Sequence, residues 1–299
     1  MTANVVPLFI NPVAGRGRAA RKLRRIVEIF DARGVTLEVV ESTRMGDVEE
    51  RIADAAREGV ERIVVAGGDG SVYETANGLL KVGGKTAFGL IPVGTGNDFA
   101  KAADVPLDWE AAAAELAGRL ATDQPPRPID AGIMNDRYFA NGVGIGFDAK
   151  INRIASKYRW PIGDFVYLVA VLEGLWDGVI TPSVRMRFDG QTYEGPVTLA
   201  NISNGPWVGG MFHIAPGAKN DDGYFDLVYA DPVGRGRVLT LLPKVIRGQH
   251  TGEAEIHTAR IREFELVAEE PLPSHLDGEA QPLQTDFEIR LLESALRLL

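Results

Sequence analysis

Residues 62–80 read RIVVAGGDGSVYETANGLL, and this stretch decides the fold class. A short run of Val and Ile is typical of a buried strand, and here it passes through a glycine-rich turn into a helical pattern that starts near Ser71. Strands are also expected at residues 5–10, 36–42 and 87–94, and a helical pattern follows each of them. Strands that alternate with helices form parallel βα units, so we expect an N-terminal α/β domain with a parallel sheet. Its helices are expected near residues 19–33, 47–58, 71–80 and 109–121.

A change of domain is expected near the middle of the chain. Residues 122–128, TDQPPRP, hold three prolines, which neither a helix interior nor a central strand tolerates. Beyond them short strands follow one another, with a tight hairpin expected at Asp189-Gly190 and one helical stretch near 161–176. We therefore expect the α/β domain at residues 1–126, a mainly antiparallel domain at 127–285, and a terminal stretch, 286–299, that packs back on the first domain.

The composition of the 299 residues excludes several classes of protein. Hydrophobic residues make up 45% and charged residues 24%, close to the globular average, which argues against disorder. The chain has no cysteine, so disulfides, thiolate metal sites and cysteine nucleophiles are all excluded. A net charge of -9 argues against nucleic acid as a partner, because nucleic acid is bound mainly through cationic contacts to its phosphates.

Neither a membrane span nor a secretion signal is expected. The longest apolar run, residues 165–176, contains Glu173 and is about half the length that a span needs, so we interpret it as a buried helix. The first residues lack the basic and apolar regions of a signal peptide. We expect a cytoplasmic protein, and the sequence does not decide between a monomer and a homodimer.

Glycine-rich loops follow three strands of the expected parallel sheet, at residues 11–18, 67–71 and 92–98. The carboxyl ends of such strands meet at one edge of the sheet, where ligands collect. Glycine permits positive φ angles and lets backbone N–H groups approach an oxyanion, and the N-terminus of a following helix favours negative charge. The three loops together predict a phosphate site, although each loop alone could be a turn with a helix cap.

Two common phosphate-binding motifs do not account for these loops. A Walker A loop requires G-x-x-x-x-G-K-[ST], and no lysine follows a glycine at that spacing. Residues 15–20, GRGRAA, match the dinucleotide pattern G-x-G-x-x-A, but Asn-Pro separates them from the strand. A Rossmann dehydrogenase is therefore a weak alternative.

Asp69 is the most informative side chain in the loops. A carboxylate opposes anion binding unless a cation lies between, and Mg²⁺ commonly bridges a carboxylate to nucleotide phosphates. We therefore predict a nucleotide with Mg²⁺, the alternative being that Asp69 only caps the following helix. A dense basic group near the first loop is either a solvated helix face or a set of anion contacts, and comprises Arg16, Arg18, Arg21, Lys22, Arg24 and Arg25.

Three segments of the second half carry further candidates. Residues 219–224, KNDDGY, offer the carboxylates and turn carbonyls that suit Mg²⁺ or Ca²⁺, or form a plain turn. Asp277-Gly278-Glu279 is a hairpin turn or a place where a carboxylate acts as a base on a hydroxyl. Residues 204–214, NGPWVGGMFHI, place four large apolar side chains among glycines, as an apolar lip for an acyl chain or as core packing. The four histidines show no metal-binding spacing, and we assign them no role.

Taken in order, these motifs resemble the bacterial diacylglycerol kinase-like lipid kinases. The likeness nearly fills the chain and rests on Asn11-Pro12 with Gly15, VVAGGDGSVYETANGL, GLIPVGTGNDFAKA, NGVGIGFDA, APGAKNDDGYFDL and the late LDGE. It implies a nucleotide cleft between an α/β domain of the NAD kinase/phosphofructokinase-like type and a mainly antiparallel β-sandwich domain. More distantly, sphingosine and ceramide kinases share the same catalytic module.

The resemblance also implies roles for individual residues. Glu279 would be the general base, and Asp69 would organise Mg²⁺ through water. The residues implied to hold ATP are Asn11, Pro12, Gly15, Thr43, Gly68, Asp69, Gly70, Ser71, Glu74, Thr95, Gly96 and Asn97. Accessory charged groups around the phosphates would be Arg16, Arg21, Asp98, Lys101 and Asp130, and a structural Mg²⁺ site would comprise Lys219, Asp222 and Tyr224.

The implied reaction is in-line transfer of the γ-phosphoryl group of ATP to a lipid hydroxyl, with diacylglycerol or a related lipid as acceptor. An enzyme of this kind without a membrane span works at the membrane surface, so we expect weak, salt-sensitive binding to anionic lipid. Two alternatives stay open: a kinase of a soluble acceptor such as NAD, and a non-catalytic regulator that binds a nucleotide.

Overall fold

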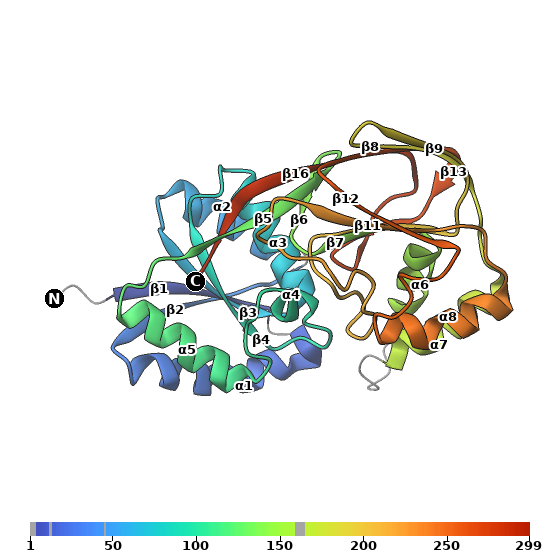
Figure 1. The fold of residues 1–299 in the computed structure, drawn as a ribbon. Helices are drawn as coiled ribbons and strands as arrows, with labels where there is room; N and C mark the ends of the chain where they lie inside the picture. Colours follow the sequence, from blue (N-terminus) through green and yellow to red (C-terminus); the bar gives the residue numbers. More distant parts are fainter. Residues whose placement is uncertain (1–3, 12–13, 45, 159–164) are drawn as a thin grey trace. The chain divides into compact units, whose positions relative to one another are not determined.

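The computed structural model describes residues 4–11, 14–44, 46–158 and 165–299 (Figure 1). The chain forms two compact units. Unit 1 comprises residues 1–131 and 293–299, and unit 2 comprises residues 132–292.

Unit 1 contains a parallel sheet in the order β2-β1-β3-β4. The apolar runs that predict these strands are buried, as in β3, where Ile63, Val64 and Val65 are almost fully covered. The strands are β1 (Asn4–Ile10), β2 (Val35–Glu41), β3 (Arg62–Gly67) and β4 (Ala87–Pro92). The helices are α1 (Ala14–Asp31), α2 (Asp47–Arg57), α3 (Asp69–Leu80), α4 (Asp98–Ala102) and α5 (Trp109–Ala121).

Helices cover both faces of this sheet (Figure 1). On one face, Phe30 of α1 and Leu116 of α5 belong to a core cluster with apolar side chains of β1, β2 and β4. On the other face α2 packs against α3. The end of the chain also joins unit 1, because Leu298 pairs in parallel with Phe88 of β4.

Unit 2 contains two antiparallel sheets. One has the order β16-β13-β8-β9, with β5 and β6 attached to it, and the other has the order β12-β11-β10-β7-β14-β15. The strands are β5 (Arg127–Met134), β6 (Arg137–Phe139), β7 (Gly142–Gly146), β8 (Ser183–Phe188), β9 (Gln191–Pro196), β10 (Leu199–Ser203), β11 (Phe225–Ala230), β12 (Ile256–Ile261), β13 (Glu263–Leu272), β14 (Ser274–Leu276), β15 (Glu279–Ala280) and β16 (Gln284–Leu298). Strands β5 and β16 each continue into unit 1.

The two sheets of unit 2 pack face to face as a sandwich. Phe188 of β8 contacts Tyr229 of β11 with ring centroids 6.3 Å apart, so aromatic side chains fill the space between the sheets. The predicted hairpin is confirmed, since Asp189 and Gly190 have φ angles of 43° and 83°. The predicted fold class, an α/β domain with a parallel sheet and an antiparallel β-sandwich, is also confirmed.

Three helices of unit 2 cover one face of its six-stranded sheet, and the sequence predicts them incompletely. They are α6 (Phe147–Ala155), α7 (Phe165–Asp177) and α8 (Arg235–Ile246). Two of them, α6 and α8, are not expected from the sequence. The third, α7, confirms the helix expected near residues 161–176 over its described part, but this helix is buried on one side only. Ala170 and Leu175 are buried against α6, but Phe165 and Trp176 are exposed.

Candidate active site

The three loops expected to bind phosphate follow neighbouring strands. Ile10 of β1 is in register with Ala66 of β3, and Gly67 of β3 with Pro92 of β4, so the three strands end at the same edge. The loops after β3 and β4 are joined by hydrogen bonds. The N–H of Val93 donates to the carbonyl of Gly67 at 2.9 Å, and the N–H of Phe99 donates to Oδ1 of Asp69 at 3.0 Å.

Glycine is required in these two loops for a reason other than the expected one. Gly67, Gly68, Gly70, Gly94 and Gly96 all lack a positive φ angle, which is found instead at Asn97, with φ 52°. A Cβ on Gly94 would lie 2.5 Å from Cα of Gly68, and one on Gly68 would lie 2.9 Å from Cα of Gly94. The two loops therefore touch backbone to backbone, and any side chain at either position would separate them.

Asp69 links the two loops and does not cap its own helix. Helix α3 begins at Asp69 itself, and Gly68, which has no side chain, is its N-cap. The alternative in which Asp69 only caps a helix beginning near Ser71 is therefore wrong. The N–H groups of Ser71 and Val72 donate to the carbonyl of Gly68, and the helix dipole adds positive potential at this end of α3. Close backbone contact and a helix N-terminus together make a surface suited to phosphate oxygens.

Two of the other predicted nucleotide residues, Thr43 and Glu74, make structural contacts within unit 1. The backbone N–H and the hydroxyl of Thr43 donate to Oδ2 of Asp47, at 2.7 and 3.1 Å. Oε2 of Glu74 accepts from the N–H of Glu49 at 3.3 Å, and burial raises the pKa of the Glu74 carboxyl while nearby backbone N–H groups oppose the rise. These contacts hold the start of α2.

Two of the predicted accessory charged residues, Asp98 and Asp130, also make contacts within unit 1. Asp98 is buried and pairs with Lys101 at 3.0 Å. Oδ1 of Asp130, a buried carboxylate, accepts from the N–H of Ser294 at 2.7 Å and so anchors the returning end of the chain within unit 1. Thr95 is exposed in the loop after β4.

The first loop is described in part. Asn11 is half-buried at the end of β1, Gly15 lies in the first turn of α1, and Pro12 and the side chain of Arg16 lie outside the described residues. Arg21 is exposed on α1. Other basic residues of α1 have partners on α1 or at the start of α5. Lys22 lies 4.8 Å from the ring centroid of Trp109, Arg24 pairs with Glu28, and Arg25 pairs with Glu28 and Glu110.

In unit 2, Glu279 follows a turn that hydrogen bonds to other segments of this unit fix in place. Asp277 and Gly278 have φ angles of 51° and 88°, as the predicted hairpin turn requires. The buried carboxylate of Asp277 accepts from the N–H groups of Ala140, Asn141 and Gly142, each at 2.8 Å. Burial raises the pKa of Asp277, and these three donors act against the rise because they favour the charged form.

Helix α6 supports the same turn from its other side. Nδ2 of Asn152 donates to the carbonyl of Gly278 at 2.8 Å, and Arg153 donates to the carbonyl of Gln281. The N–H of Gly278 donates to Nδ1 of His275 at 3.4 Å. Glu279 itself is half-buried. Asn152, Arg153 and His275 were not singled out from the sequence, because their roles depend on contacts over long sequence distances.

Two of the predicted metal residues of unit 2, Asp222 and Tyr224, lie next to each other. Oδ1 of Asp222 accepts from the N–H of Tyr224 at 3.1 Å, and Arg260 forms an ion pair with the same carboxylate. The guanidinium of Arg260 also lies 4.3 Å from the ring centroid of Tyr224. A cation at Asp222 would compete with Arg260, and the metal site of Lys219, Asp222 and Tyr224 stays a prediction.

Comparisons with known proteins match this architecture over both units. Residues 6–132 match the diacylglycerol kinase catalytic domain, and residues 141–299 match the YegS C-terminal NAD kinase beta sandwich-like domain. A diacylglycerol kinase from Mycobacterium tuberculosis is 30% identical over 98% of this chain and 94% of its own length. One from Bacillus subtilis is 28% identical over 91% and 88%. A crystal structure of a diacylglycerol kinase from Bacillus anthracis has a TM-score of 0.74 at 25% identity, covering 100% of this chain and 97% of its own.

The fold and these matches define a phosphotransferase with an alcohol group as acceptor. The chain belongs to the bacterial diacylglycerol kinase-like family of lipid kinases. The resemblance inferred from the glycine-rich loops is thereby confirmed. In the described residues, no helix is both long enough and apolar enough to cross a membrane.

Proposed function

We propose that the protein is an ATP- and Mg²⁺-dependent kinase that transfers the γ-phosphoryl group to a hydroxyl of diacylglycerol or a closely related lipid. The observation that carries this proposal is the contact between Gly68 and Gly94 beside the N-terminus of α3. Backbone amides at a helix N-terminus bind phosphate without any lysine, which accounts for the missing Walker A motif. The relatives that carry the name diacylglycerol kinase support a lipid as acceptor.

Asp69 is the residue that we propose for holding Mg²⁺. Mg²⁺ in nucleotide sites uses one or two carboxylates and completes its shell with phosphate oxygens and water. Among the residues that the structure describes, no group of three His, Asp or Glu side chains is placed to hold a metal. In this proposal the nucleotide phosphates and water complete the shell around the ion. When bound, the ion would neutralise charge on the phosphoryl oxygens.

Unit 2 supplies the proposed general base, Glu279. Its carboxylate would accept the proton of the lipid hydroxyl as that oxygen attacks the γ-phosphorus. Asp277 and Asn152 are positioning residues, because they fix the backbone on either side of Gly278. Little covalent chemistry is left to the protein, so positioning supplies most of the rate enhancement.

Helix α7 supports the further proposal that the enzyme works at a membrane surface. One face of this helix exposes Phe165, Leu172 and Trp176 to 65%, 53% and 85%. A basic group lies beside it, because Nη2 of Arg235 donates to the carbonyl of Trp176 at 3.1 Å. Exposed aromatic residues next to cations are suited to the interface of an anionic membrane.

The function is tested by offering several acceptors to the purified chain. Labelled ATP with Mg²⁺ is incubated separately with diacylglycerol, a sphingoid base, phosphatidylglycerol and NAD. We expect label in diacylglycerol or another of the lipids, and we expect Asp69→Asn to lose this Mg²⁺-dependent transfer. Label in NAD alone would make the protein a kinase of a soluble acceptor. Nucleotide binding without transfer to any acceptor would make it a regulator.

A further inference from the structure

Gly144 of β7 leaves a gap on one face of the six-stranded sheet of unit 2. It is in register with His275 of β14 on one side and with Asn201 of β10 on the other. Residues directly opposite on neighbouring strands project their side chains from the same face of a sheet, so the gap lies between the side chains of His275 and Asn201. The carboxylate of Asp148, from α6, fills it. A Cβ on Gly144 would collide with Oδ2 of Asp148 and with Nε2 of His275.

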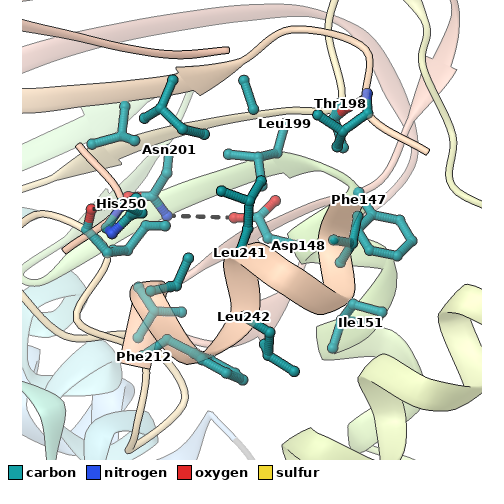
Figure 2. A pocket seen from close by; sticks show the side chains of 18 of the residues that line it. Phe147, Asp148, Ile151, Thr198, Leu199, Asn201, Phe212, Leu241, Leu242 and His250 are labelled. Atoms are coloured by element: carbon teal, nitrogen blue, oxygen red, sulfur yellow. Dashed lines mark hydrogen bonds between the residues drawn. The ribbon is translucent and has the colours of Figure 1, made fainter. Parts of the chain in front are cut away.

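The carboxylate of Asp148 is held between these two strands. Oδ1 accepts from the N–H of Ala149 at 2.8 Å, and Oδ2 accepts from Nδ2 of Asn201 at 3.4 Å (Figure 2). The same Oδ2 lies 3.7 Å from Nε2 of His275. Asp148 and Asn201 stand at the wall of an apolar cavity of about 140 Å³, and the side chain of Asp148 is 18% exposed. In such surroundings a carboxylate attracts a nearby N–H group more strongly than it does in water.

The ring of His275 connects Asp148 with the turn before Glu279. Its side chain is 3% exposed. Because Nδ1 accepts from the N–H of Gly278 at 3.4 Å, the proton of the neutral ring is on Nε2. Nε2 is buried beside Asp148 and has no hydrogen-bond partner among the residues that the structure describes. A separation of 3.7 Å is too long for a hydrogen bond, so the carboxylate acts on Nε2 by electrostatic attraction and favours this tautomer.

We propose that Asp148 and His275 form a buried pair that positions the turn carrying Glu279: Asp148 sets the tautomer of His275, and His275 holds the N–H of Gly278. The inference rests on the proposed function, in which Glu279 is the base. Asn152 holds the carbonyl of Gly278, and so fixes the peptide plane after this residue. His275 fixes the plane before it. A displacement of about 1 Å can cost 10²-fold in rate, so both planes matter for a base in this turn.

Three substitutions of His275 in the full chain test this role through the kinetics of lipid phosphorylation. His275→Leu removes both ring nitrogens, His275→Asn puts an acceptor close to the position of Nδ1, and His275→Gln puts its polar atoms close to that of Nε2. We expect kcat to fall about tenfold in the Leu and Gln variants and to stay close to the parent value in the Asn variant. KM for ATP should be the same in all three.

The control and the contradicting results are specific to this pair. His257→Asn breaks the other histidine–aspartate pair of unit 2, with Asp231, in which both side chains are more than a third exposed, and it should keep the parent kcat. A parent kcat in His275→Leu, or equal kcat values in the Asn and Gln variants, would overturn the proposal. Thermal unfolding shows which variants fold.

Nuclear magnetic resonance of the nitrogen-15-labelled histidine rings tests the pair without ATP or lipid. We expect His275 of the parent, assigned by the loss of its signals in His275→Asn, to carry its proton on Nε2. In Asp148→Asn, which keeps the size of the side chain, we expect the form protonated on Nδ1 to appear. A parent ring protonated on Nδ1 would overturn the proposal, whether or not the variants fold. An Nε2-protonated ring in a parent that phosphorylates no lipid would retain the contact and refute the kinase function.

Discussion

Asp277 and Asp189 occupy the same position in two Asp-Gly turns, yet their surroundings differ. The carboxylate of Asp189 is exposed and accepts from the N–H groups of Arg262 and Glu263. That of Asp277 is buried and accepts from three N–H groups that water cannot reach. The sequence predicts both turns equally well. Which of the two carboxylates is buried depends on contacts between segments 135 residues apart in the sequence. A local sequence pattern cannot predict such contacts.

The pair provides a matched test of stability. Asp277→Asn puts an amide donor against backbone donors and leaves at least one buried N–H without an acceptor, so we expect a loss of about 1–3 kcal/mol in the free energy of unfolding. Asp189→Asn keeps a residue that tolerates positive φ, and water replaces any lost contact, so we expect about 0.5 kcal/mol or less. Urea unfolding of both variants measures the difference, and equal losses would contradict the role of Asp277.

The proposed role of Glu279 as general base is tested by removing its carboxylate. Glu279→Gln removes the proton acceptor and nearly preserves the shape, so we expect kcat for lipid phosphorylation to fall by about 10²-fold or more. KM for ATP should stay unchanged, because the loops proposed to bind the nucleotide belong to unit 1. Glu270→Gln, on an exposed part of β13, is the control. A Glu279→Gln enzyme that keeps the parent kcat would remove the assignment of the base.

At the scale of secondary-structure elements, the parallel strands and their helices could be predicted because local patterns specify them. Helix α6 is missed because it follows β7 directly through Gly146, with φ 95°, and leaves no loop between strand and helix. Helix α8 is missed because Pro243 lies inside it and reads as a helix breaker. Helix α6 supports the turn before Glu279 through Asn152 and Arg153, so the candidate site is predicted less completely than the fold.

The start of α2 gives a pH-dependent prediction. The N–H of Thr43 and the guanidinium of Arg51 hold the pKa of Asp47 below its ordinary value of 3.8. A carboxyl group whose pKa is lowered by folding stabilises the protein above its unfolded pKa, and this contribution is lost as pH falls through the folded value. We therefore expect Asp47→Asn to be less stable than the parent at pH 7 and the gap to close below pH 3.8. Urea midpoints across this range measure it, and a constant gap would contradict the account.

The exposed face of α7 gives a prediction about membranes. Trp176→Ala removes an exposed aromatic side chain without disturbing the core, so we expect about tenfold weaker binding to vesicles that contain phosphatidylglycerol. Binding of the parent should also weaken as salt rises. Leu107→Ala, at an exposed apolar residue of unit 1, should bind like the parent. Co-sedimentation with vesicles measures all three proteins, and unchanged binding of Trp176→Ala would exclude α7 as the contact.

At the scale of the whole molecule, the order of the strands explains why the three glycine-rich loops lie near one another. β1, β3 and β4 are neighbours, so loops that follow residues 10, 67 and 92 lie at one edge of one sheet. The sequence predicts this gathering from the βα pattern alone. It does not predict that Gly68 and Gly94 touch, because a glycine needed for close approach looks the same in a sequence as one needed for positive φ.

The measurement that tests the central claim most directly is calorimetric titration of ATP into the purified chain, with and without Mg²⁺. We predict one-to-one binding that requires Mg²⁺, because the amides of the loops and the carboxylate of Asp69 must share the phosphates with a cation. If no association is detected with Mg²⁺ and millimolar ATP, the loops after β3 and β4 are not a nucleotide site, and the proposed kinase mechanism is wrong.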